Sequence, residues 1–298
     1  MKKKFLLVLP LLFGVFATSC SNDPATKPVS RNEFVNNLNN VKKQAETTTN
    51  TSGVRFSAET KVETDLTING QTLKLFAENK NEVKANGNKL VASTSVDTHG
   101  ETLIEGKKQS VNASVKANLW GEYNKTASEV KLMMDLDAKA KTEGQEGSQN
   151  AKYYTILPQT LDPEKFYEYV KEVSEDYGSF TAEQIDEAMK SLQETLIADF
   201  GYIKDGETEV FTISQKTNAG ENNVAELNVK LRFDGYLLTK YEIDTTAKVT
   251  DPTGKVSYIK ASNKVSAEEF KGDIVLPDVA GYQEISFENF EQALDELN

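Results

Sequence analysis

The sequence predicts an α+β fold in which a long, curved, half-barrel-like antiparallel β-sheet is covered on one face by helices. The first observation behind this prediction is that apolar and polar side chains alternate with a period of two over two long regions of the chain. The second is that segments with helical spacing precede, separate and follow these regions. Strands and helices do not alternate along the chain, which argues against a parallel, doubly wound sheet.

The first element is an amphipathic helix that begins near residue 30. Ser30 and Glu33 have the spacing of a capping box, and Phe34, Leu38 and Val41 follow at helical intervals. These three side chains predict the face that packs against the sheet.

The first run of strands begins at Gly53. Val54, Phe56 and Ala58 start an apolar series that continues to Ile68, and Asn69-Gly70 is a strong hairpin signal. The alternation predicts further strands around 73–83, 90–96, 111–119 and 130–140, with a turn at His99-Gly100 and a loop over 142–150.

Helical spacing returns in the middle of the chain. It predicts a short helix starting at Asp162-Pro163-Glu164 and a longer one from Thr181 to about Phe200. A second run of strands is expected over 210–264, and a last helix from Ser286. Many inward positions of the strands are Ala or Thr, which either lets the helices approach closely or leaves a cavity beneath them.

Composition excludes several classes of function. Lys and Arg number 34 against 46 Asp and Glu, so the formal net charge is −12, which disfavours binding to nucleic acid. The chain has one His and one Cys, which excludes multi-His metal sites and zinc or redox sites of the CxxC type.

The N-terminus has the features of an export signal. Three lysines precede a mostly apolar stretch from Phe5 to Ala17, which is shorter than a spanning helix, and the small residues Ala17-Thr18-Ser19 lead into Cys20. This pattern resembles the lipobox of bacterial lipoproteins, with Ala17 in place of the usual Leu. The resemblance implies cleavage before Cys20 and a diacylglycerol thioether on its thiol, with palmitate among the attached chains; the alternative is an ordinary secretory signal.

These features predict a signal peptide over 1–19, a lipidated tether over 20–29 and a single domain over 30–298. The protein is then expected at the extracytoplasmic face of the cell membrane, with the membrane as its partner through the anchor and no known protein partner.

The order of elements over 30–298 resembles the LolA/LprG class of exported lipid carriers, although no motif carries this likeness. It implies a binding protein that holds a hydrophobic or lipidic ligand between sheet and helices. The alternative is a cell-surface interaction or structural module without a cavity, and an enzyme ranks third.

We predict no catalytic residue, no cofactor and no metal site. Two Ser-x-x-Lys matches, Ser128 with Lys131 and Ser257 with Lys260, fall on predicted strands, where residues three apart point to opposite faces. His99 is expected in a turn. Trp120, Tyr123 and Tyr153-Tyr154 are expected to pack at strand ends, with the mouth of a cleft as the alternative. Cys20 is therefore the one functional residue that the sequence predicts.

Overall fold

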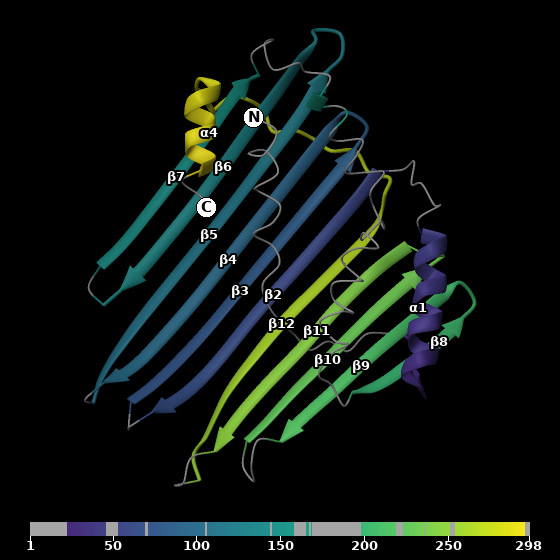
Figure 1. Ribbon diagram of the computed structural model, residues 1–298. Coiled ribbons are helices and arrows are strands. Elements are labelled where there is room, and N and C mark those ends of the chain that lie inside the picture. The colour runs from purple at the N-terminus through teal and green to yellow at the C-terminus, as the bar shows by residue number, and fades with distance from the viewer. Residues whose placement is uncertain are drawn as a thin grey trace.

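A computed structural model describes residues 23–45, 53–68, 71–104, 106–143, 145–157, 165–166, 168, 198–218, 223–235, 237–250 and 254–295. Thirteen strands form one sheet, whose order is β1-β8-β9-β10-β11-β12-β2-β3-β4-β5-β6-β7-β13. Within two runs of strands, β2 to β7 and β8 to β12, strands that follow each other in the sequence lie side by side, as Figure 1 shows. The sheet therefore consists of two meanders placed next to each other.

The first meander contains the longer strands. Its strands are β2 (Gly53–Ile68), β3 (Gln71–Asn86), β4 (Lys89–Ile104), β5 (Lys107–Asn124), β6 (Glu129–Thr142) and β7 (Gln145–Ile156). The second meander contains β8 (Asp199–Asp205), β9 (Thr208–Asn218), β10 (Asn223–Asp234), β11 (Leu237–Thr250) and β12 (Val256–Phe270). Two short strands, β1 (Lys27–Val29) and β13 (Gln283–Glu284), lie at the outer edges.

The register confirms the predicted alternation. Val54 lies opposite Ala85, and Leu90 lies opposite the same alanine from the other side. Because opposed residues share a face, one side of the sheet, here called the apolar face, carries the following side chains of both meanders: Val54, Val83, Leu90, Leu132, Met134, Phe211, Leu231 and Val265. The other side, the polar face, carries Glu59, Lys80, Glu82, Lys116 and Lys264.

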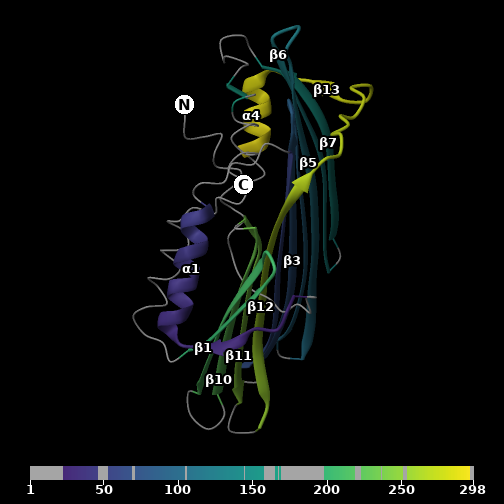
Figure 2. The ribbon, with the colours of Figure 1, turned by 90° about the vertical axis from the view of Figure 1, so that its right-hand side faces the viewer.

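The helices α1 (Arg31–Ala45) and α4 (Phe287–Asp295) both pack on the apolar face. Figure 2 shows the two helices on the same side of the sheet. The predicted cap of α1 is confirmed, since the Glu33 backbone N–H donates to Ser30 Oγ at 3.2 Å, and α4 has the same cap from Ser286. Phe34, Leu38 and Val41 of α1 are all buried, as the spacing predicts.

The predicted α+β fold with a helical cover is wrong. In the described part of the chain α1 lies over β8 to β11 and α4 lies near β7, while the sheet has thirteen strands. Strands are spaced about 4.8 Å apart and a helix is about 10 Å across, so each helix shields only a few strands. The described part of the chain is nearly all β.

Three local predictions are also wrong. The turn expected at His99-Gly100 is absent because β4 continues to Ile104, and the loop expected over 142–150 is a tight hairpin between β6 and β7. Phe200, expected at a helix end, belongs to β8. Of the helix expected from Asp162, the structure describes only 165–166 and 168, which are helical, and most of the helix expected from Thr181 lies outside the described residues.

Candidate functional site

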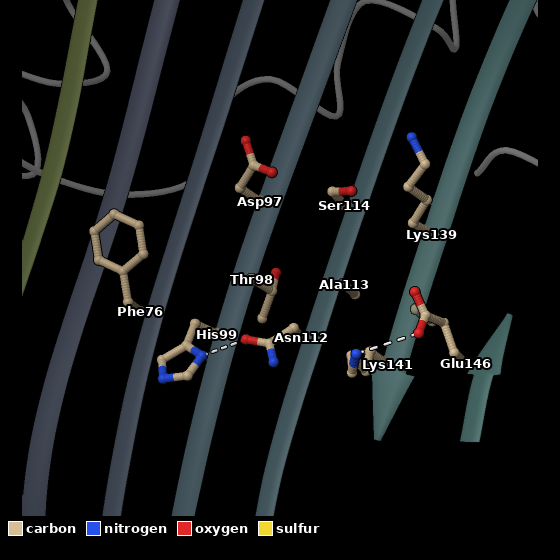
Figure 3. A pocket seen from close by; sticks show the side chains of 11 residues that line it. Phe76, Asp97, Thr98, His99, Asn112, Ala113, Ser114, Lys139, Lys141 and Glu146 are labelled. Atoms are coloured by element: carbon tan, nitrogen blue, oxygen red, sulfur yellow. Dashed lines mark hydrogen bonds and ion pairs between the residues drawn. The ribbon is translucent and has the colours of Figure 1, made fainter. Parts of the chain in front are cut away.

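A shallow groove of about 350 Å³ crosses the polar face over β3 to β7, and Figure 3 shows its lining. His99 Nδ1 is hydrogen-bonded to the amide oxygen of Asn112 on the next strand, and Lys141 is paired with Glu146 at 3.2 Å. His99 Nε2 lies 3.5 Å from Glu101, which also holds Lys108 at 2.8 Å. Each of these polar groups therefore has a partner among the described residues.

The backbone ladder between the two meanders is short. β12 pairs with β2 over four positions, from Ala267 opposite Phe56 to Phe270 opposite Gly53. Farther along these strands, side chains bridge the gap: the Thr67 N–H donates to Ser257 Oγ at 3.0 Å, and the Tyr258 hydroxyl donates to Glu63 at 2.6 Å. We call this interrupted junction between β12 and β2 the seam.

A larger groove, of about 610 Å³, opens on the polar face at the seam. It begins where the ladder ends, because Ser57 and Glu59 of β2 and Lys264 and Ser266 of β12 line it. Its other lining residues are Ala58, Lys80, Asn81, Glu82, Ser93, Thr94, Ser95, Lys116, Asn118, Lys240 and Val265. Among the described residues, this seam groove is lined by small hydroxyl side chains, two amides and charged side chains, and by no aromatic residue.

The carboxylates of the seam groove are neutralised by neighbouring cations. Glu59 lies 3.0 Å from Lys61 and 3.7 Å from Lys80. Glu82 lies 2.5 Å from both Arg55 and Lys84. Burial raises the pKa of Glu82, but the hydrogen bonds from Lys84 and Arg55 outweigh it and hold the pKa below its ordinary value.

Two cations of the groove differ from the rest. Among the described residues, neither Lys116 nor Lys264 lies within ion-pair distance of a carboxylate. The groove therefore has a local excess of positive charge, although the whole chain has a formal net charge of −12. Lys264 lies on β12 and Lys116 on β5, four strand spacings apart, so an extended ligand with more than one carboxylate is needed to contact both ammonium groups.

One carboxylate beside the groove is held partly neutral. Asp244 lies on the polar face of β11, and burial together with repulsion from Glu242 raises its pKa to about 6, against an opposing effect of Lys264. Asp244 Oδ1 is buried without a hydrogen-bond partner. Near neutral pH this carboxyl group therefore titrates beside Lys264.

The N-terminal segment 23–29, here called the strap, lies against the second meander. The Asp23 carboxylate is 2.6 Å from Lys230 and from Arg232 and 3.7 Å from Lys240, and its side chain is only 2 % exposed. The strap then crosses the polar face, where the Thr26 and Thr212 hydroxyls are 2.8 Å apart, and joins the sheet as β1 beside β8.

A glycine makes this crossing possible. A Cβ at Gly201 would clash with the side chains of Thr26 and Thr212, so only glycine leaves room for the strap there. Of the segment expected as a tether over 20–29, the described part is therefore docked on the sheet through both a buried ionic cluster and a strand. Sequence reasoning missed this cluster because nothing local to Asp23 points to cations some two hundred residues away.

The structure separates the other residues that the sequence singled out. Ser257 and Lys260 lie on opposite faces of β12, as predicted, whereas Ser128 lies in the β5–β6 turn with a φ of 51° and not on a strand. Tyr123 is buried on the apolar face, and Trp120 belongs to the opposite face, so these two rings do not form one mouth. Cys20 lies outside the described residues.

Two features are absent from the described residues. No group of three or more His, Cys, Asp or Glu side chains there is arranged to hold a metal ion. No helix in that part of the chain has both the length and the apolarity needed to cross a membrane.

The expectation of a LolA-like lipid carrier is wrong. Both grooves lie on the polar face, open to solvent, whereas a lipid site between sheet and helices requires an apolar cavity on the other face. In the described residues α1 and α4 sit directly on filled cores, where Phe34 and Phe290 are fully buried.

Comparisons with known proteins give little further information. No family model matches the chain, and no curated protein matches it. Among solved structures, it is similar to the translocator domain of autotransporter NalP from Neisseria meningitidis, with 8 % identity, a TM-score of 0.22, and coverage of 80 % of this chain and 95 % of that one. The likeness found is to a translocator domain and not to a lipid carrier, and at this TM-score it carries no argument about function.

Proposed function

We propose that the protein is exported, held at the extracytoplasmic face of the membrane by a diacylglycerol on Cys20, and binds an extended acidic peptide segment of another protein in the seam groove. It acts by binding and not by catalysis. The observation that carries the binding proposal is the excess of positive charge in the seam groove of a strongly acidic chain.

The protein itself contains an example of the proposed recognition. The strap is an extended segment whose carboxylate, that of Asp23, is bound by Lys230, Arg232 and Lys240 of the polar face. Lys240 also lines the seam groove, so the cluster and the groove are continuous. The same face therefore offers Lys116 and Lys264 for carboxylates of a second extended segment.

The lining favours a peptide over a sugar polymer. Sugar-binding sites commonly use an aromatic side chain as a platform, and none of the described residues that line the seam groove is aromatic. The short ladder at the seam leaves backbone N–H and C=O groups of β2 and β12 outside the strand pairing, and an extended peptide can bond to such groups.

Fluorescence anisotropy with a labelled oligoglutamate peptide tests the groove. The Lys116→Ser/Lys264→Ser double variant is expected to raise Kd about tenfold, which corresponds to about 1.4 kcal/mol. Lys248→Ser is the matched control, because Lys248 is an exposed lysine on the same face outside the groove. Equal affinity of the double variant and the control contradicts the proposal, as does tighter binding of an acidic oligosaccharide or an oligonucleotide.

Metabolic labelling tests the anchor. The natural chain is expected to incorporate labelled palmitate and to fractionate with membranes, whereas the Cys20→Ala variant incorporates none and is released. A Cys20→Ala variant that stays with the membrane contradicts anchoring through this residue.

A further inference from the structure

The docked strap limits the distance between Cys20 and the folded domain. Asp23 is fixed in the Lys230/Arg232/Lys240 cluster, and Cys20 precedes it by three residues. A fully extended chain spans about 3.5 Å per residue, so Cys20 lies within about 10 Å of the cluster. If residues 23–29 were not docked, the ten residues of a tether over 20–29 would allow about three times this distance between Cys20 and the domain.

The cluster is built to hold the strap firmly. A carboxylate that is 2 % exposed and contacts three cations is costly to extract, because removal leaves those cations without their central partner. Hydrogen bonds from Arg232 to Asp234 and Asp23 hold the pKa of Arg232 above its ordinary value. The Thr26 contact with Thr212 and the pairing of β1 with β8 secure the rest of the strap.

The cluster is also next to the seam groove. Lys240 belongs to both, and Ser266, which lines the groove, lies directly opposite Lys240 on β12. β7, which lies near the far edge of the sheet, is separated from this position by β2 to β6. A membrane held close to Asp23 therefore lies near one end of the groove and far from β7.

We propose that the strap clamps the domain to the lipid surface in one orientation, with the Asp23 cluster and the adjoining end of the seam groove at the headgroup layer and β7 pointing away. This inference rests on the proposed anchor at Cys20. The surface that faces the membrane is the polar face of β10 and β11, and its partner is the zwitterionic headgroup layer of the bilayer that holds the anchor. An acidic segment reaching the groove then binds next to the membrane.

Quenching by lipids with nitroxide-labelled headgroups tests this orientation on the lipidated full chain in phosphatidylcholine vesicles. A thiol-reactive fluorophore is placed at Ser266→Cys, beside the cluster, or at Ser148→Cys on β7; both serines are exposed. Lipidation occupies the thiol of Cys20, so each variant has one reactive thiol. The probe at 266 is expected to be quenched at least threefold more strongly than the probe at 148.

Two further variants separate the clamp from the anchor. An insertion of six Gly and Ser residues between Asn22 and Asp23 leaves the strap intact but lengthens the link by about 20 Å, and it is expected to abolish the excess quenching at 266. Asp23→Ala, which releases the strap, is expected to do the same, with circular dichroism confirming that the sheet is retained. Asp278→Ala, an exposed aspartate outside the cluster, is the control.

The outcomes distinguish the two proposals. Equal quenching of both probes in the natural chain, or quenching at 266 that the insertion leaves unchanged, overturns the clamp while the protein remains on the vesicles. Failure of the protein to acquire lipid and to remain on the vesicles overturns the anchor, and with it the clamp.

Discussion

The two meanders share the same alternating pattern but differ in what their faces contain. In the second meander, α1 packs on a cluster of aromatic rings. The ring centroid of Phe34 is 5.1 Å from that of Phe200 and 5.4 Å from that of Phe211, and the Phe211 and Phe233 centroids are 5.7 Å apart. The first meander has longer strands, and several positions on its apolar face are Ala or Thr. Its buried cluster contains residues near one end of those strands, such as Val54, Ala85, Leu90 and Val130.

The polar face of the first meander carries a series of ion pairs between neighbouring strands. Cross-strand ion pairs recur along it, including Lys61 with Glu78 at 3.0 Å and Lys74 with Asp65 at 3.0 Å. Such exposed pairs contribute little to stability individually, but they fix the register and keep a broad face soluble. One sheet therefore combines an aromatic core under α1 in the second meander with a buried cluster near one end of the strands and a charged lattice along the polar face in the first.

The largest effect is expected from the aromatic core of the second meander. Phe211→Ala removes a fully buried ring that contacts Phe34, Tyr202 and Phe233, and it is expected to lower the free energy of unfolding by about 3–5 kcal/mol in urea denaturation. Phe76→Ala in the first meander is the matched control, because Phe76 is 40 % exposed, and it is expected to cost less than about 1 kcal/mol. Equal losses would remove the distinction between the meanders.

An intermediate effect is expected where the first meander is tightly packed. A Cβ at Gly121 would clash with the Phe166 ring and lie 3.3 Å from Leu132 Cδ2, so Gly121→Ala is expected to cost about 1–3 kcal/mol. Gly147→Ala, on the same meander, places its methyl group where no atom lies within 4 Å. Thermal unfolding should show a lower Tm for the first variant and an unchanged one for the second; similar values would mean that the first meander has no tight core.

The smallest effect is expected beside the seam and depends on pH. The pKa of Asp244 is raised to about 6 in the folded protein, so the folded state binds this proton more tightly than the unfolded state. The resulting stabilisation is present at low pH and is lost as pH rises through about 6. Asp244→Asn is therefore expected to leave stability unchanged below pH ~4 and to raise it by about 1–2 kcal/mol above pH ~7. A gain that does not vary with pH contradicts the assigned pKa.

Local patterns in the sequence predicted much of the sheet. Alternation from Val54 to Ile68, the capping box at Ser30 and the apolar spacing of Phe34, Leu38 and Val41 all depend on neighbouring residues, and the structure confirms them. The prediction failed at His99-Gly100, where a glycine suggested a turn although both neighbouring strands continue past it. Cross-strand pairing determined that position, and pairing is not visible in one strand alone.

The candidate site was beyond such local reasoning. The seam groove depends on β12 meeting β2, and the strap depends on Asp23 meeting Lys230 and Arg232; each contact joins residues far apart in the sequence. A single sequence shows which residues are charged but not which of them meet. The lipid carrier was predicted from the order of helices and strands, and that order says nothing about whether the space between them is open or filled.

The strap and α1 have a consequence for the order in which the protein assembles. Thr26 and its partner Thr212 are separated by 186 positions, and Val29 pairs with Phe200. Because the chain is synthesised from its N-terminus, β1 and α1 emerge well before the strands that receive them. The earliest residues to emerge are among the last to reach their native contacts, and such long-range closure makes folding slow.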